Sequence, residues 1–179
     1  MSDTNTALGP LELTDGRWVV GDSRRPEGSW VEFRAEGLYQ HTPAPEGELI
    51  PWSRIMLGMG VTLGRGYPSR GNFTALGLLG GLPGLKGRGG GHLVMTLRHP
   101  YEDRRVYFDR HPRWYGISEI VILEELLGQT VAAGEVHRLA DADWLRRVVA
   151  RLAPPVPRTA GGIRKAVTQA LQTQEPTVA

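Results

Sequence analysis

The segment HLVMTLRHPYEDRRVYFD, residues 92–109, carries the clearest structural signal in the 179-residue chain. Apolar and polar residues alternate through both of its halves, with the period of two that a half-buried β-strand requires. A short polar stretch around Pro100 separates the two halves. The segment therefore predicts an antiparallel hairpin whose apolar side chains face one core. These side chains are Leu93, Met95, Leu97, Val106 and Phe108.

The register of this hairpin is constrained by the same alternation. Because both apolar sets must face one core, each cross-strand pair joins an odd-numbered residue to an even-numbered one. Pairing Arg98 with Arg105 would place like charges opposite each other, which is unfavourable. We therefore expect Arg98 to pair with Asp103, which places His92 beside Asp109 on the outer face.

Shorter strands are expected before this hairpin. They are predicted at residues 17–21, 30–33, 38–41 and 49–57, and residues 59–63 could continue the last of them. A turn at Glu36-Gly37 separates the second from the third and indicates another hairpin. Residues 1–15 show no comparable pattern, so we expect them to form a flexible N-terminal lead.

After Pro112 the apolar residues recur at helical spacing. We expect helices at 117–128, ended by Gly128, at 141–152, capped by Asp141, and at 160–172, capped by Thr159. A proline-rich linker precedes the last helix, so residues 154–179 are expected to form a linker and a C-terminal helix. The apolar stripe of helix 160–172 needs a cover, so this helix either docks on the domain or pairs with another chain in an oligomer.

Charge is unevenly distributed, although the net charge is only +2. Residues 1–48 carry nine acids and four bases, and residues 102–179 carry ten acids and eleven bases, whereas residues 49–101 carry six bases and no acid. The acid-free part holds 13 of the 24 glycines, all of them in a glycine-rich segment at residues 58–91. Long loops in compact domains are usually functional, so we expect this segment to bind an anionic group. Its four bases are Arg65, Arg70, Lys86 and Arg88.

Histidines and carboxylates near the hairpin offer an alternative function. Imidazole and carboxylate groups suit zinc or manganese, so a metal-dependent enzyme could use them. The residues concerned are His92, His99, Asp109 and His111. Their spacing is not that of a known metal-binding motif, and charge pairing at a polar hairpin tip explains them as well.

Two further anionic ligands remain open. Arg105 and Tyr107 would share the outer face of the hairpin, where guanidinium and aromatic groups can hold single-stranded nucleic acid. The apolar stretch at residues 76–85 lies next to Lys86 and Arg88, a combination that could contact anionic lipid.

Several classes of protein are disfavoured by composition. The chain has no cysteine, which excludes disulfides and thiolate metal sites. It has no apolar run of the roughly 20 residues that span a bilayer and no secretory pattern at its start, so we expect a cytoplasmic protein. The glycines of the 58–91 segment match neither the dinucleotide fingerprint nor the P-loop, and we expect no cofactor.

The residues Glu36-Gly37-Leu38, followed by Ile50-Pro51-Trp52-Ser53-Arg54-Ile55, resemble a pattern in bacterial pleckstrin-homology-like (PH-like) domains. The resemblance implies an α+β fold in which an antiparallel β-roll or barrel is closed by C-terminal amphipathic helices, with residues 141–152 as the capping helix. It places the domain at residues 16–153, with the glycine-rich segment as an insert. Such domains usually bind lipid head groups, peptides or proteins and are rarely catalytic. We therefore predict a non-catalytic binding or scaffolding module that recognises an acidic protein partner or another anionic ligand.

Overall fold

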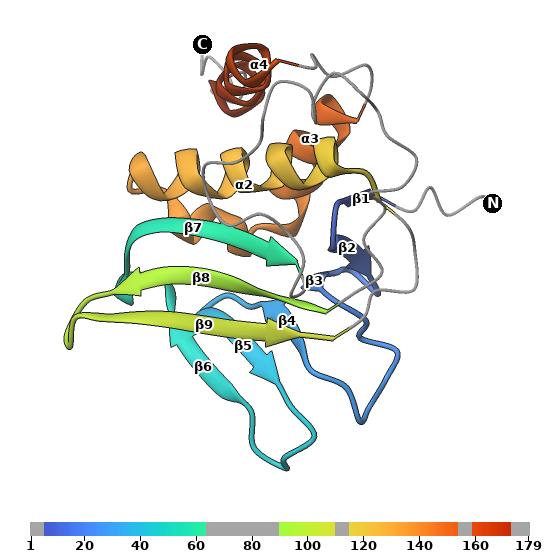
Figure 1. Ribbon diagram of the computed structural model, residues 1–179, viewed down its shortest axis with the longest axis vertical. Coiled ribbons are helices and arrows are strands. Elements are labelled where there is room, and N and C mark those ends of the chain that lie inside the picture. Colours follow the sequence, from blue (N-terminus) through green and yellow to red (C-terminus); the bar gives the residue numbers. More distant parts are fainter. Residues whose placement is uncertain (1–5, 64–89, 110–114, 154–158, 173–179) are drawn as a thin grey trace, which may run out of the picture.

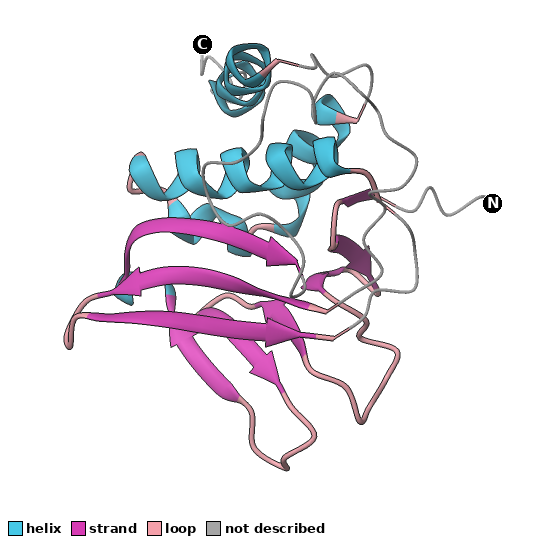
Figure 2. Ribbon diagram, in the orientation of Figure 1, coloured by secondary structure: helices cyan, strands magenta, loops and turns pink. Residues whose placement is uncertain are grey.

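The structure is a computed structural model that describes residues 6–63, 90–109, 115–153 and 159–172. These residues form an α+β fold with two antiparallel sheets, coloured by secondary structure in Figure 2. The first sheet is a meander of β1 (Ala7–Leu8), β2 (Leu11–Thr14), β3 (Arg17–Val20), β4 (Trp30–Phe33), β5 (Gly37–His41) and β6 (Glu48–Pro51). The second sheet contains β7 (Ile55–Leu63), β8 (Gly91–Leu97) and β9 (Glu102–Phe108). The helices are α2 (Ile117–Ala132), α3 (Ala142–Leu152) and α4 (Ala160–Gln172), with short 3-10 turns η1 (Trp52–Arg54) and η2 (Val136–Ala140).

The second sheet lies between the helices and strands β4, β5 and β6. Figure 1 shows α2 lying along β7, α4 on the far side of α2, and β4, β5 and β6 beyond β9. Because the two sheets are separate, the described residues form no closed barrel. The α+β class and the antiparallel sheets are thus confirmed, and the expected barrel closure is not. No helix in the described ranges is long and apolar enough to cross a membrane.

The chain passes from the first sheet to the second through η1. The Trp52 side chain is buried there, and its Nε1–H donates to the Arg34 carbonyl at 2.9 Å. The Trp52 backbone N–H donates to the Glu36 carbonyl at 3.2 Å. These bonds tie the crossing to the β4–β5 turn, so the single strand expected at residues 49–57 is wrong. It is two strands in different sheets, because burying Trp52 bends the chain between them.

The 92–109 hairpin is confirmed, but its register differs from the expected one by two residues. His92 pairs with Tyr107 and Thr96 pairs with Asp103, so the predicted apolar side chains still face the core. The Arg98 backbone N–H donates to the Arg54 carbonyl at 2.8 Å, which holds Arg98 against the start of β7 instead of β9. The loop is therefore residues 98–101, and Thr96 Oγ1 donates to Asp103 Oδ1 at 2.8 Å.

Residues 6–14 are part of the fold, and the expectation of a flexible lead across residues 1–15 is wrong there. Strands β1 and β2 pair antiparallel, and Leu11 of β2 pairs with Val20 of β3. Leu8 and Leu11 are buried in the core beneath α2. Strands this short leave no periodic pattern in the sequence.

The helix caps agree with the sequence expectations. Asp141 Oδ1 accepts hydrogen bonds from the backbone N–H groups of Asp143 and Trp144 at 3.0 and 2.9 Å. Thr159 Oγ1 accepts from the N–H of Gly162 at 3.1 Å. Gly128 does not end its helix, because α2 continues to Ala132.

The C-terminal helix α4 docks back onto the domain. Its apolar side chains Ile163, Val167 and Ala170 are buried, and the helix packs on α2 and α3. The stripe that would have served an oligomer through helix 160–172 is therefore covered by the same chain. The apolar stripe of α4 therefore no longer gives a reason to expect an oligomer.

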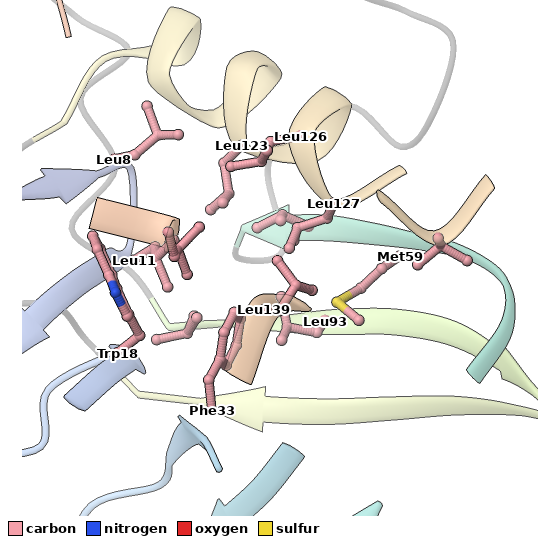
Figure 3. Packing of buried hydrophobic residues seen from close by; sticks show 14 of the residues in the cluster. Leu8, Leu11, Trp18, Phe33, Met59, Leu93, Leu123, Leu126, Leu127 and Leu139 are labelled. Carbon is pink, nitrogen blue, oxygen red and sulfur yellow. The ribbon is translucent and has the colours of Figure 1, made fainter. Parts of the chain in front are cut away.

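One hydrophobic core joins both sheets to the helices. Figure 3 shows leucines of α2 descending between Leu11 on one side and Met59 and Leu93 on the other. Trp18 of β3 lies at the edge of this cluster and donates from Nε1 to the Ala142 carbonyl at 3.0 Å. The core therefore fixes the inner face of the first sheet, and the alternate residues of each strand lie on its outer face.

Candidate functional site

A continuous cross-strand row crosses the outer face of the first sheet. The pairings Glu12–Val19, Val19–Glu32, Glu32–Tyr39 and Tyr39–Leu49 connect five strands in one line. We call these five residues the outer row. Two of its members are buried carboxylates, which need partners because an unpaired charge is costly to bury.

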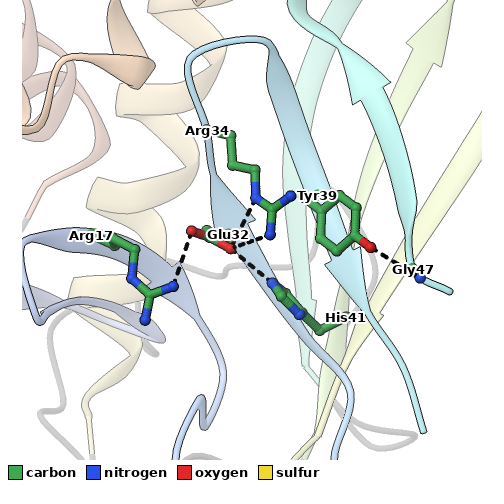
Figure 4. Close-up of polar contacts among 6 residues, drawn as sticks. All are labelled: Arg17, Glu32, Arg34, Tyr39, His41 and Gly47. Carbon is green, nitrogen blue, oxygen red and sulfur yellow. Dashed lines mark hydrogen bonds and ion pairs between the residues drawn. The ribbon is translucent and has the colours of Figure 1, made fainter. Parts of the chain in front are cut away.

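Glu32 is the centre of the polar contacts on this face (Figure 4). Its Oε1 accepts from Arg17 Nη1 at 3.3 Å, and its Oε2 accepts from Arg34 Nε at 3.0 Å and lies 2.8 Å from His41 Nε2. The Glu32 side chain is only 6 % exposed. Burial alone would raise the pKa of Glu32. Hydrogen bonds from His41 and Arg34, with the charges of Arg34 and Arg17, outweigh burial and lower that pKa.

His41 is held as a neutral imidazole. Its ring stacks on Trp30, with ring centroids 3.5 Å apart and planes 8° apart. Burial lowers the pKa of His41, the charges of Arg34 and Arg17 add to this effect, and the opposing influence of Glu32 is smaller. Because an ionised carboxylate only accepts hydrogen bonds, Nε2 carries the ring proton and donates a hydrogen bond to Glu32. The ring thus acts as a fixed donor.

Arg34 is fixed from its other side by Tyr39. The guanidinium carbon lies 3.7 Å from the centroid of the Tyr39 ring, a stacked arrangement that suits arginine. The Tyr39 hydroxyl accepts from the Gly47 N–H at 3.1 Å. A Cβ at Gly47 would lie 2.3 Å from the Gln40 carbonyl oxygen and 2.6 Å from the Tyr39 ring, so the position requires glycine. The site therefore presents an arginine whose geometry is set by its neighbours.

A second ion pair neutralises Glu12 at the other end of the outer row. Arg24 Nη2 donates to Glu12 Oε1 at 2.6 Å, and the Arg24 backbone N–H donates to Asp22 Oδ1 at 3.1 Å. The hydrogen bond to Glu12 raises the pKa of Arg24 against the opposing effect of burial. This cluster is engaged with its own carboxylates and leaves the Glu32 cluster as the more cationic part of the face.

The four bases expected to bind an anion, Arg65, Arg70, Lys86 and Arg88, lie outside the described residues. What the structure shows is where their segment is attached. Leu63 at the end of β7 pairs with Gly91 at the start of β8. The residues on either side of 64–89 therefore lie at neighbouring positions in one sheet.

Of the metal alternative, the described residues His92, His99 and Asp109 do not form one group of ligands. His92 faces Tyr107 with ring centroids 5.3 Å apart, and Asp109 Oδ2 accepts from the Ser29 N–H at 2.7 Å. His99 lies in the loop at the opposite end of the hairpin, about 20 Å from His92 along the strand. His111 lies outside the described residues. Within the described ranges, no group of three metal-ligating side chains could hold an ion.

The Glu32 cluster was not identified from sequence, although part of it had a signal. The predicted 30–33 and 38–41 hairpin, joined at Gly37, implies that Glu32 and His41 share a face, as the observed register shows. Arg17 had no such signal. It comes from β3, which a nine-residue connection separates from β4, so a short turn does not fix their register.

No protein-family model, curated protein or solved structure matches this chain. The resemblance to PH-like domains therefore remains a prediction. The order of strands first and helices afterwards agrees with it.

Proposed function

We propose that the protein is a non-catalytic binding module that recognises an acidic partner protein through the bases of its glycine-rich segment. The observation that carries the proposal is the pairing of Leu63 with Gly91. It attaches both ends of residues 64–89 to one end of the second sheet. The acid-free segment that holds the four bases Arg65, Arg70, Lys86 and Arg88 is therefore flanked by residues at neighbouring positions of that sheet.

The charge pattern of the described residues supports the same reading. Glu12 and Glu32 are bonded to arginine. Arg17, Arg24 and Arg34, which pair with them, are partly exposed, and guanidinium groups favour anionic ligands. The PH-like resemblance adds a class of domain that binds more often than it catalyses.

The experiment compares two variants with the same change in charge. In one, the four segment bases are replaced by Gln. In the other, four exposed bases of α3 and α4 are replaced by Gln: Arg146, Arg147, Arg164 and Lys165. Fluorescence anisotropy with a labelled poly-glutamate peptide then measures affinity at low and at physiological salt.

We expect the segment variant to weaken binding by about 2 kcal/mol, roughly thirtyfold, and the helix variant to retain most of the affinity. Equal losses in both variants would show a non-specific effect of net charge. Unchanged binding in the segment variant would remove the segment from the function.

Single-stranded nucleic acid is a second candidate, favoured by the outer face of β9. Arg105 and Tyr107 are both exposed there, on the same face as His92. Asp103 lies on that face too and opposes a polyanion. A labelled oligonucleotide in the same assay tests this candidate, since Tyr107→Ala removes a stacking surface without changing charge. Oligonucleotide binding that is unaffected by this substitution would exclude the outer face of β9 as the nucleic-acid site.

A further inference from the structure

Arg17 and Arg34, the two arginines beside Glu32, have more N–H donor groups than the Glu32 carboxylate uses. A guanidinium has five N–H donors. Arg17 donates to Glu32 through Nη1 alone, and Arg34 donates through Nε, with its Nη2 2.9 Å from Glu32 Oε2. Among the described residues neither side chain donates to any other group. The side chains are 52 % and 37 % exposed, so their remaining donors reach the surface.

We propose that Arg17 and Arg34 together bind a carboxylate side chain of an acidic partner peptide, as a site separate from the glycine-rich segment. The inference rests on the proposed function in one respect, because both expect an acidic partner. It differs in the residues that carry it, all of which belong to the structured sheet.

Charge complementarity favours a carboxylate over a phosphate. Two guanidinium charges face one Glu32 charge, while His41 is neutral and donates to the same carboxylate, so the cluster carries one surplus positive charge. A carboxylate supplies one negative charge and balances it. A phosphate dianion would leave an unbalanced charge close to the buried Glu32.

The neighbouring acids set the position of the ligand. Glu12 and Asp22 share Arg24 on the far side of Val19, about 10 Å from Glu32 across two strands. An anion is repelled from that side. An anion held by both guanidinium groups is therefore expected to extend over Arg34 towards β5 and β6, with Arg17 of β3 at its other end.

An apolar neighbour on that side indicates a peptide ligand. Leu49 is 41 % exposed and pairs with Tyr39, and the Arg34 guanidinium stacks on the Tyr39 ring. Because Leu49 lies one strand from Tyr39 and two strands from Glu32, a ligand that contacts Arg34 and Leu49 carries a carboxylate and an apolar group about 5–10 Å apart, which suits a peptide of mixed acidic and apolar residues. The stacked geometry of Arg34 also reduces the ordering cost on binding.

The test is an NMR titration of the full-length protein with a peptide that repeats Glu-Ser-Leu-Ser, because its glutamates and leucines lie on the same side of an extended chain. The readout is the Nε–H resonances of Arg17 and Arg34 and the amide of Leu49. We expect these signals to shift, and we expect no shift with the matched glutamine and leucine peptide. Peptide binding that moves only signals elsewhere would overturn the proposal.

Arg17→Gln is the matching variant, because Glu32 keeps Arg34 and His41 as partners. We expect it to weaken the acidic peptide about fivefold to tenfold, with Arg147→Gln on α3 as a control of equal charge change. Leu49→Ser removes the apolar contact without touching the ion pairs, and should weaken binding about threefold.

Other results separate the two proposals. If the four-Gln segment variant loses binding while Arg17→Gln and Leu49→Ser bind normally, this inference fails and the proposed function stands. If the two sheet variants alone lose binding, the sheet site stands and the segment assignment fails. Equal shifts with inorganic phosphate or phosphatidylserine vesicles would refute the carboxylate assignment.

Discussion

Glu32 and His41 contact each other diagonally across the β4–β5 hairpin, with His41 Nε2 2.8 Å from Glu32 Oε2. The folded state lowers the pKa of both groups. For Glu32 the lowering comes from donors and positive charges that outweigh burial, and for His41 it comes chiefly from burial. The pair is thus most stable as a carboxylate that accepts from a neutral imidazole.

Acidification should therefore destabilise the protein in two steps. The unfolded chain takes up a proton on each group at a higher pH than the folded protein does, so the free energy of unfolding falls as pH falls. For His41 the fall begins below its ordinary pKa of 6.5, and for Glu32 below 4.5. Urea unfolding at pH values of about 7.5 and 5.5 measures the first step. His41→Gln keeps an N–H donor but does not titrate, so it should reduce that step.

His92 provides the comparison for this prediction. Burial, together with the charge of Arg105, also lowers the pKa of His92, so it contributes to the same pH range. His92→Gln should remove its own share, and the two effects should add because the two histidines lie in different sheets. A His41→Gln variant with the full pH dependence of the wild type would show that His41 titrates as it does in the unfolded chain.

Replacing Glu32 by Gln should cost about 2 kcal/mol of unfolding free energy, because it removes charge-assisted hydrogen bonds to Arg17 and Arg34. Glu27→Gln is the matched control. Glu27 pairs with Arg25 at 3.5 Å but is exposed, and exposed pairs contribute about 0.5 kcal/mol or less. Chemical denaturation at neutral pH distinguishes them, and equal effects would mean that Glu32 is not a structural centre.

Two glycine substitutions should have opposite effects on stability. Gly47→Ala places a methyl group against the Gln40 carbonyl and the Tyr39 ring, which should cost about 1–3 kcal/mol. Gly128→Ala adds a methyl group in open space within α2 and should stabilise by up to about 1 kcal/mol. Thermal unfolding of both variants measures this contrast. An unchanged unfolding temperature for Gly47→Ala would show that the β5–β6 connection adjusts to the added methyl group without cost.

The parts of the fold that local patterns determine were predictable. Alternation in residues 92–109 identified β8 and β9 and their core face, and Asp141 and Thr159 marked helix starts. The register of that hairpin was not predictable, because it depends on the bond from Arg98 to Arg54, 44 residues away in sequence. Local pairing rules cannot include such a contact.

The candidate site was less predictable for a related reason. Its charges are ordinary surface residues in the sequence, and only the meander brings Arg17 of β3 to Glu32 of β4. The segment bases were conspicuous in sequence because no acid interrupts them. The arginines around Glu32 were not conspicuous, because acidic residues lie close to them in the sequence and balance their charge.

The packing of α4 gives a final prediction about association. Val167 is fully buried between α4 and the helices beneath it, so Val167→Ala should cost about 2 kcal/mol by leaving a cavity. Lys165→Ala, on the exposed side of the same helix, should be nearly neutral. If α4 instead packed against a second chain, Val167→Ala would reduce the association state measured by light scattering. Because the apolar side of α4 is already covered by α2 and α3, we expect stability to fall with no change in association.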